Sequence, residues 1–199
     1  MAARRGRLIV IAGPSGVGKG SLVLSLLERD PHEMALSVSV TTRAPRAGEI
    51  HGEHYLFVSD GSFDRMIADG DLLEWAPVVG HRSGTPRVAV EEMLDSGRDV
   101  ILEIDVQGAE QVRRLVPEAV LIFLAPPTME ELERRLRDRG TETDEGIAAR
   151  LAIAHREMEQ RPWFDHVVVN DDLDRASSQV ADIIDGSSSV PPDVPEDPS

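Results

Sequence analysis

The sequence predicts an α/β fold, in which helices cover both faces of a parallel β-sheet. Three runs of apolar and β-branched residues, 7–12, 99–105 and 119–125, lack the polar alternation of a half-exposed strand, which is typical of strands buried on both faces. Segments with helical periodicity lie between these runs. Strands that alternate with helices along a chain indicate parallel strands joined by crossover helices.

The predicted elements follow one another in a regular order. A glycine-rich turn after the first strand leads into a helix, and one face of that helix carries Leu22, Val23, Leu26 and Leu27. The segment GAEQVRRLV has helical character, and Thr128 with Glu131 forms a capping box that opens the next helix. We expect a helix over residues 145–160, a strand over 166–170 and a final helix over 173–184.

Residues 35–97 depart from this alternation. The segments SVSVTT and HYLFV are expected to form exposed strands, and two helical stretches follow them. We interpret this part of the chain as an inserted α+β lobe. The final segment, GSSSVPPDVPEDPS, holds four prolines, four serines and three acids, which predicts a disordered acidic tail over residues 186–199.

The composition limits the kinds of partner. A chain of 199 residues suits one domain, and zero cysteines exclude disulfides, thiolate catalysis and cysteine-type zinc sites. No apolar run approaches the roughly 18 residues of a membrane span, so we expect a cytoplasmic protein. The formal charge of −15 argues against binding to nucleic acid or to an anionic membrane. An anionic ligand must therefore be held by local clusters of cations.

The glycine-rich turn has the spacing of a phosphate-binding loop. Gly13-x4-Gly18-Lys19 lies between a predicted strand and a predicted helix, which is the context that the Walker A motif requires. Its main-chain N–H groups and the helix N-terminus favour an anion, and its lysine reaches the outer phosphates of a nucleotide. The order of the glycines excludes the dinucleotide-binding pattern, and Ser15, which is followed directly by glycine, excludes the nucleophile elbow. The predicted ATP-binding residues are Gly13, Pro14, Ser15, Gly16, Val17, Gly18, Lys19, Gly20 and Ser21.

Two residues of this loop need an explanation. Lys19 is the only lysine among the 21 basic residues, which indicates a site where a compact, flexible ammonium cannot be replaced by a planar guanidinium. Gly20 stands where such loops usually have a Ser or Thr that helps to hold magnesium. Here the hydroxyl comes one residue later, at Ser21, in a GKG[ST] pattern that resembles that of adenylate kinases. We therefore expect magnesium to depend mainly on water and the nucleotide, with no metal ligands among the side chains.

Two groups of arginines are candidate anion-binding clusters. Arg43 and Arg46 flank a proline in SVSVTTRAPRAGEIHGEHY and follow several hydroxyl residues, so they can form an anion clamp. A solvated basic loop is the alternative. Arg135, Arg139 and Arg150 belong to RRLRDRGTETDEGIAARL. For this group an ordinary salt-bridged helix face is the alternative.

Taken together, the motifs resemble the guanylate kinases, a family of nucleoside monophosphate kinases within the P-loop phosphotransferases. GPSGVGK, SVSVTTRAPRAGE, EIDVQGA, RGTETDE and VVVNDDLDRA occur in the family's order between about residues 6 and 184. The resemblance implies a five-stranded parallel P-loop kinase core with helices on both faces, an inserted GMP-binding lobe and a helical lid. It implies one domain over residues 1–185, with its core at 6–34 and 98–185, the lobe at about 35–97 and the lid at about 137–155.

The resemblance also implies an activity and a set of site residues. The activity is magnesium-dependent transfer of the γ-phosphoryl group of ATP to GMP, giving ADP and GDP, in purine nucleotide metabolism. The residues implied to bind GMP are Arg43, Arg46 and Tyr55 at its phosphate and Ser39, Glu74, Thr85 and Asp105 at its base. The implied catalytic residues are Lys19, Arg46, Arg135, Arg139 and Arg150. Such a reaction needs positioning and cations around the transferred charge, with a lid that excludes water.

One departure and two alternatives remain open at this stage. Ser83 stands where the family often has a tyrosine that reaches the GMP phosphate, and Arg82 is a candidate to compensate. One alternative is a catalytically inactive interaction module of the same fold, against which Lys19 argues. The other is a kinase for another nucleoside monophosphate, against which Glu74 and the segment TTRAPR argue. The expected partners are ATP and GMP, and the expected state is a monomer or homodimer.

Overall fold

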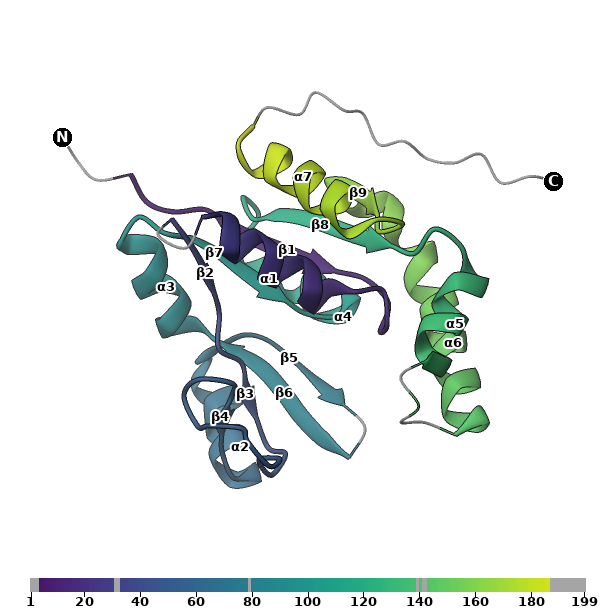
Figure 1. The fold of residues 1–199 in the computed structure, drawn as a ribbon. Helices are drawn as coiled ribbons and strands as arrows, with labels where there is room; N and C mark the ends of the chain where they lie inside the picture. The colour runs from purple at the N-terminus through teal and green to yellow at the C-terminus, as the bar shows by residue number, and fades with distance from the viewer. Residues whose placement is uncertain (1–3, 31–32, 79, 139, 141–142, 187–199) are drawn as a thin grey trace. The chain divides into compact units, whose positions relative to one another are not determined.

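The protein is described by a computed structural model that covers residues 4–30, 33–78, 80–138, 140 and 143–186 (Figure 1). A five-stranded parallel sheet with the order β2-β7-β1-β8-β9 confirms the predicted α/β class. Its strands are β1 (Leu8–Ala12), β2 (Met34–Leu36), β7 (Asp99–Glu103), β8 (Val120–Ala125) and β9 (His166–Val169). The helices are α1 (Lys19–Arg29), α2 (Asp60–Asp69), α3 (Arg87–Asp95), α4 (Val106–Leu115), α5 (Met129–Asp138), α6 (Asp144–Glu159) and α7 (Leu173–Ile184), with a 3-10 turn at Arg161–Trp163.

The elements of the five-stranded sheet follow the sequence patterns closely. Strand β1 is buried along its whole length, as its continuous apolar run predicts. Helix α5 begins directly after Thr128, whose hydroxyl accepts a hydrogen bond from the Glu131 N–H at 3.1 Å. Helix α7 has the predicted bounds. The sequence does not predict β2, because a three-residue strand is too short to show a pattern.

A second sheet has four strands in the order β4-β3-β6-β5. They are β3 (Val40–Thr41), β4 (Leu56–Phe57), β5 (Leu72–Val78) and β6 (His81–Pro86). Strand β3 is parallel to β4 and antiparallel to β6, and β5 pairs with β6 in antiparallel fashion. The expectation that SVSVTT forms an exposed strand is wrong, because Val40 is fully buried and packs with Phe63 and Leu72 in a small apolar core.

The β5–β6 hairpin is also not predicted from the sequence. Strand β6 reads HRSGTP, in which Thr85 is the only β-branched residue and no Val, Ile, Phe, Tyr or Trp marks a strand. Tertiary packing selects its residues instead. A Cβ atom on Gly84 would lie 2.7 Å from the Glu74 carbonyl oxygen, so β5 and β6 can approach as they do only because residue 84 is glycine.

The chain divides into two compact units, which are described separately. One contains Met1–Ile9, Asp30–Leu102 and Gln107–Ala119, and we call it the lobe unit because it includes the second sheet. The other, the loop unit, includes the glycine-rich turn and contains Val10–Arg29, Glu103–Val106 and Val120–Ser199.

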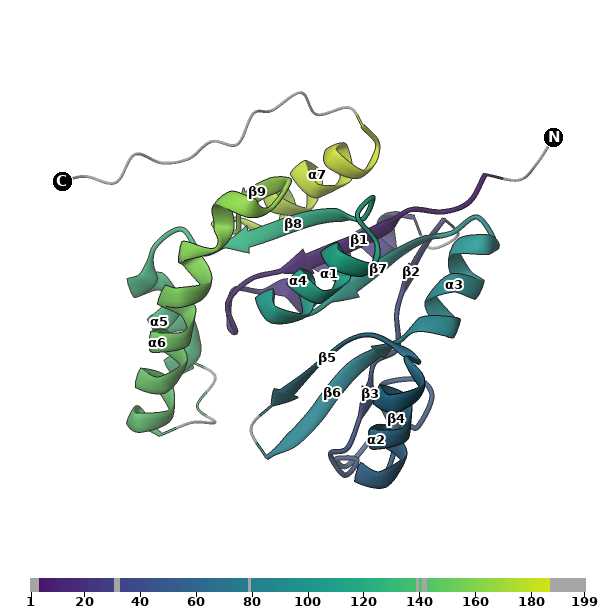
Figure 2. The ribbon, with the colours of Figure 1, turned by 180° about the vertical axis from the view of Figure 1, so that it is seen from behind.

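Within the loop unit, α1 packs against α7 and α5 packs against α6. Helices α1 and α7 are in contact, with the hydroxyl oxygens of Ser25 and Ser177 2.9 Å apart between them. The rings of Phe123 and Phe164 meet edge to face at 5.1 Å. Helices α5 and α6 lie side by side in both views (Figures 1 and 2). This pairing places two arginine-bearing helices in the same unit as the glycine-rich turn.

Within the lobe unit, α2 packs on the second sheet. The helix begins after Ser59, whose hydroxyl accepts a hydrogen bond from the Ser62 N–H, and it ends at Gly70, which has a left-handed φ of 73°. Its Phe63 is fully buried against Val40 and Leu72. Figure 2 shows this helix beside the strands of the second sheet.

Candidate active site

The glycine-rich turn forms a tight loop between β1 and α1. Gly13, Gly16 and Gly18 have backbone φ values of 144°, 93° and 102°, which residues other than glycine rarely adopt. A Cβ atom on Gly13 would lie 2.2 Å from the Leu124 carbonyl oxygen. The loop therefore depends on glycine for both its backbone angles and its close packing. Its main chain leads directly into the N-terminus of α1, a position that favours anions.

Lys19 is the first residue of α1, and its side chain folds back over the loop. Its Nζ atom donates hydrogen bonds to the carbonyl oxygens of Gly13 at 2.6 Å and Pro14 at 3.2 Å. These two carbonyl oxygens fix the position of the ammonium group at the loop, from which it can turn to donate hydrogen bonds to a bound phosphate.

Two of the predicted catalytic arginines contact this loop. Arg135 from α5 donates to the main-chain oxygens of Val17 at 3.2 Å and Asn170 at 2.9 Å, and its Nε donates to Glu131 at 2.8 Å. Arg150 from α6 donates to the Ser15 hydroxyl at 2.9 Å. Three elements, α1, α5 and α6, therefore bring cationic side chains to one loop.

The third arginine predicted in this group, Arg139, lies outside the described residues.

Asn170, which sequence reasoning did not select, supports the loop from the end of β9. Its side chain is buried, and its Nδ2 donates to the Val17 carbonyl oxygen at 2.8 Å. A Cβ atom on Gly18 would lie 2.5 Å from the same Nδ2. Asn170 thus contacts the loop and Arg135 together. In the sequence, the only signal of this supporting role is that the polar Asn170 directly follows the apolar run VVV of β9.

An acidic group faces Lys19. Desolvation by neighbouring atoms raises the pKa of Glu103, whose side chain nevertheless remains exposed, and the charge of Lys19 opposes this rise. Burial likewise raises the pKa of Glu157 on α6, while Lys19 lowers it and Asp105 raises it. The Glu103 carboxylate oxygens lie 3.6 Å from the position that a Cβ atom on Gly20 would take. Sequence reasoning missed Glu103, although it occupies the last position of β7.

In the lobe unit, Arg43 is held by a carboxylate. Its two Nη atoms donate to the two Glu49 oxygens at 2.9 and 2.8 Å, and the Arg46 main-chain N–H donates to Glu49 at 2.7 Å. The Arg43 guanidinium also lies 5.3 Å from the Tyr55 ring centroid. The hydrogen bond from Arg43 lowers the pKa of Glu49 to about 2, with a further contribution from the Arg46 N–H. Arg43 and the main chain of Arg46 therefore meet at Glu49, a residue that sequence reasoning missed, and Tyr55 lies against Arg43.

The side chain of Arg46 is exposed at the surface.

Glu74 and Thr85 form a buried polar pair on neighbouring strands. They are 5% and 1% exposed, and the Thr85 hydroxyl donates to Glu74 Oε1 at 2.6 Å. Their strands place them directly opposite one another in the β5–β6 register. Ser39 is half-buried, and its carbonyl oxygen accepts from the Leu56 N–H at 2.8 Å. Asp105 belongs to the loop unit, where it is half-buried after the end of β7.

Ser83, which stands where the family often has a tyrosine, and its neighbour Arg82 both make contacts within the lobe unit. The Ser83 hydroxyl donates to the Val40 carbonyl oxygen at 3.1 Å, within the sheet. Arg82 forms ion pairs with Asp60 at 2.8 Å and Asp64 at 2.5 Å, and its guanidinium lies 4.8 Å from the Phe63 ring centroid. Arg82 therefore attaches β6 to α2, and this structure gives it a role within the lobe.

Comparison with known proteins agrees with this arrangement. The family model described as guanylate kinase matches residues 5–187. The chain belongs to the guanylate kinase family. A guanylate kinase of Synechococcus sp. (strain CC9311) is 54% identical over 174 residues, which cover 87% of this chain and 91% of that relative. The guanylate kinase of Streptomyces coelicolor is 53% identical over 176 residues, covering 88% of this chain and 89% of that relative.

A solved structure gives the same assignment. The crystal structure of guanylate kinase from Anaplasma phagocytophilum matches with a TM-score of 0.74 at 33% identity, covering 96% of this chain and 90% of that chain. The family membership inferred from the motifs is therefore confirmed. Within the described residues, no helix is both long and apolar enough to span a membrane.

Proposed function

We propose that this guanylate kinase family member transfers the γ-phosphoryl group of ATP to GMP, producing ADP and GDP. The observation that carries the proposal is the convergence of Lys19, Arg135 and Arg150 on the glycine-rich loop. Phosphoryl transfer requires little covalent chemistry from a protein but requires cations around the charge of the transferred group. An interaction module would have no need for such a cluster.

The residues of Gly13–Ser21 bind the phosphates of ATP. Their main-chain N–H groups and the N-terminus of α1 favour the anion. Lys19 exchanges its hydrogen bonds with the Gly13 and Pro14 carbonyls for the outer phosphates. Arg135 and Arg150, together with Arg139, contact the transferred group. Arg150 lies in the segment proposed as a lid, residues 137–155, whose closure excludes water and prevents hydrolysis.

The proposed lobe, residues 35–97, binds GMP. Arg43, Arg46 and Tyr55 hold its phosphate, and the Glu49 carboxylate fixes the Arg43 guanidinium and the Arg46 main chain for that task. An arginine that is already oriented loses less side-chain entropy when it binds a phosphate.

The base of GMP is held by Ser39, Glu74, Thr85 and Asp105. Guanine presents two adjacent donors, N1–H and the 2-amino group, and one carboxylate can accept from both. The Thr85 hydroxyl already bonds to one Glu74 oxygen, which restrains the rotation of that carboxylate. Adenine presents an acceptor at N1, so Glu74 selects against it.

Guanylate kinases typically use magnesium-bound ATP. Among the described residues, no group of three or more His, Asp or Glu side chains could hold a metal ion by itself. The residues present fit a magnesium ion that keeps its waters and the nucleotide phosphates as main ligands, because the Glu103 carboxylate lies beside the position of Gly20. Glu103 and Ser21 would contact the hydrated ion. When bound, magnesium neutralises part of the phosphate charge.

A coupled assay of ADP release tests the proposal. GMP, AMP, UMP and CMP are each supplied with magnesium and ATP, and GMP is expected to be used far better than the other three. The matched control is Lys19→Met, which removes the positioned cation and is expected to reduce ADP release with GMP by about 10³-fold. ADP release that is equal with all four nucleotides would contradict the proposed substrate.

A further inference from the structure

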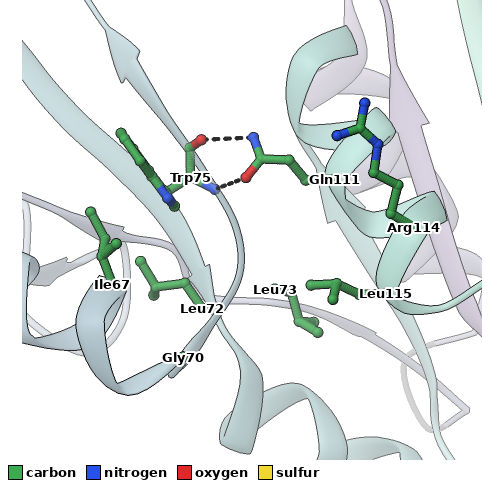
Figure 3. Close-up of a pocket in the computed structure, with 8 residues that line it drawn as sticks. All are labelled: Ile67, Gly70, Leu72, Leu73, Trp75, Gln111, Arg114 and Leu115. Carbon is green, nitrogen blue, oxygen red and sulfur yellow. Dashed lines mark hydrogen bonds between the residues drawn. The ribbon is translucent and has the colours of Figure 1, made fainter.

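A small pocket lies between β5 and α4 in the lobe unit, and its lining does not include the buried pair of Glu74 and Thr85. Apolar side chains, including Leu72, Leu73 and Leu115, line it (Figure 3). Gln111 of α4 is the one uncharged polar side chain among the pocket residues, and Figure 3 shows its amide turned toward the main chain of β5. The mechanism described above does not use Gln111.

The Gln111 amide pairs with the open edge of β5. This strand is the last in the order β4-β3-β6-β5, so only one of its edges is paired with another strand. The Trp75 N–H donates to Gln111 Oε1 at 3.2 Å, and Gln111 Nε2 donates to the Trp75 carbonyl oxygen at 2.9 Å. One side-chain amide thus supplies the donor and the acceptor that a neighbouring strand would supply.

These two hydrogen bonds act next to the residue proposed to read the base. The peptide group that joins Glu74 to Trp75 contains the N–H held by Gln111, so the bond restrains the backbone rotation on the C-terminal side of the Glu74 Cα. On the opposite edge of β5, Glu74 pairs with Thr85 and its carbonyl oxygen lies close to Gly84. Strand β5 is therefore held from both edges at the position from which the Glu74 carboxylate projects.

We propose that Gln111 is a positioning residue for guanine recognition, which fixes the main chain at Trp75 so that the Glu74 carboxylate faces the base at a defined angle. This inference rests on the proposed function, because it assumes that Glu74 reads guanine. A carboxylate that accepts from two donors is sensitive to small rotations, whereas acceptance from a single donor tolerates them. Loss of Gln111 should therefore affect GMP more than an analogue with only one donor.

The test compares GMP with inosine monophosphate, which has the N1–H donor but lacks the 2-amino group. The variant Gln111→Met keeps the length of the side chain and removes both hydrogen bonds. We expect kcat/KM for GMP to fall about tenfold, mainly through KM, and the ratio of kcat/KM for GMP to that for inosine monophosphate to fall about fivefold. KM for ATP should stay within about twofold of the parent value, because its site is built from other elements.

The matched control is Arg114→Met, because Arg114 lies on the same helix as Gln111 and lines the same pocket. Its side chain is 72% exposed and pairs with Glu110, so the substitution should leave the GMP ratio unchanged. If Gln111→Met does not fold, Gln111→Glu is used, because it keeps the acceptor for the Trp75 N–H and sets a carboxylate oxygen against the Trp75 carbonyl. It should lower the same ratio.

The outcomes separate this inference from the proposed function. If the parent protein does not phosphorylate GMP, the proposed function fails and this inference fails with it. The second outcome is that the parent phosphorylates GMP, but the Gln111 variant keeps the parental ratio of kcat/KM for GMP to that for inosine monophosphate. In that case the positioning role is overturned and the proposed function stands. An equal fall in the ratio for Arg114→Met would also overturn it, since the effect would then come from the pocket in general.

Discussion

Lys19 and Arg43 are both proposed to bind phosphate, but different parts of the chain hold them in place. The Lys19 ammonium rests on two main-chain carbonyls of the glycine-rich loop. The Arg43 guanidinium is held by both oxygens of one carboxylate, Glu49. In the first case the backbone sets the position of the cation, and in the second a side chain does so.

This difference decides which substitutions each region tolerates. The loop requires glycines at positions with left-handed φ values or close packing, such as Gly13 and Gly18, so adding a single Cβ atom should damage it. The Arg43 region also contains a glycine with a left-handed φ, Gly48 at 87°, but a Cβ atom there would meet no other atom within 4 Å, so the sensitive point of this region is the charge of Glu49.

The largest effect is expected at Lys19. Lys19→Met removes the cation from the transferring phosphate and should reduce kcat by about 10³-fold while the melting temperature stays near that of the parent. Lys19→Arg should fail nearly as badly, because a planar guanidinium cannot occupy the position between the Gly13 and Pro14 carbonyls. Steady-state kinetics and thermal melting measure both. Full activity in the arginine variant would show that the loop does not select for lysine.

The second largest effect is expected at Gly18, in the same loop as Lys19. Gly18→Ala introduces a Cβ atom 2.5 Å from Asn170 Nδ2 at a residue with a φ of 102°. Strain of about 1–3 kcal/mol is expected, with a loss of about 100-fold in kcat/KM for ATP. Gly20→Ala is the matched substitution, because its Cβ atom would make an ordinary 3.6 Å contact with Glu103. It should lose less than about threefold. Equal losses in the two variants would contradict the role assigned to backbone strain.

A smaller effect is expected from the carboxylate that holds Arg43. Glu49→Gln keeps the shape of the side chain and removes its charge, so the guanidinium becomes free to rotate. KM for GMP should rise about tenfold, with kcat and KM for ATP within about twofold of the parent values. Initial rates at varied GMP and varied ATP measure this. An equal rise in both KM values would show that the effect is not confined to the GMP phosphate.

The same residue predicts a dependence of stability on pH. The pKa of Glu49 is lowered from an ordinary value of 4.5 to about 2, first by the hydrogen bond from Arg43. A carboxylate with a lowered pKa in the folded state stabilises the fold above pH 4.5, and this contribution disappears as the pH falls toward 2. The parent should therefore melt at a higher temperature than Glu49→Gln near pH 6, and the difference should shrink below pH 4.5. A difference that stays constant down to pH 2 would contradict the lowered pKa.

The sequence predicts the parts of the molecule that carry a long, continuous pattern. The apolar runs of β1 and β8 and the capping box at Thr128 give their elements directly, and the glycine spacing locates the loop. Single-sequence patterns fail where packing rather than propensity selects the residues. Strand β6 is mostly polar, and it contains Gly84 because β5 approaches it closely there, which no local pattern reveals.

The partners of the predicted site residues are likewise hidden from the sequence. Glu49 and Arg43 are close along the chain, yet nothing in the loop between them indicates a bidentate ion pair. Asn170 contacts Val17 from the other end of the chain, and Gln111 contacts Trp75 across 36 positions. Such contacts depend on the fold, so they become visible only when the elements are placed in space.

The most direct test of this account concerns Glu74, where a buried side chain rather than the backbone is proposed to choose the substrate. The measurement is the ratio of kcat/KM for GMP to that for AMP, in the parent and in Glu74→Gln. The parent should favour GMP by about 10⁴-fold or more, because a site built for hydrogen bonds rejects a mismatched base strongly. The glutamine variant sets an amide donor against a guanine donor, so the ratio should fall by at least about 100-fold through loss of GMP use, with KM for ATP nearly unchanged. A glutamine variant that discriminates as well as the parent would contradict the account, and base selection would then have to reside elsewhere, with Asp105 as the next residue to test.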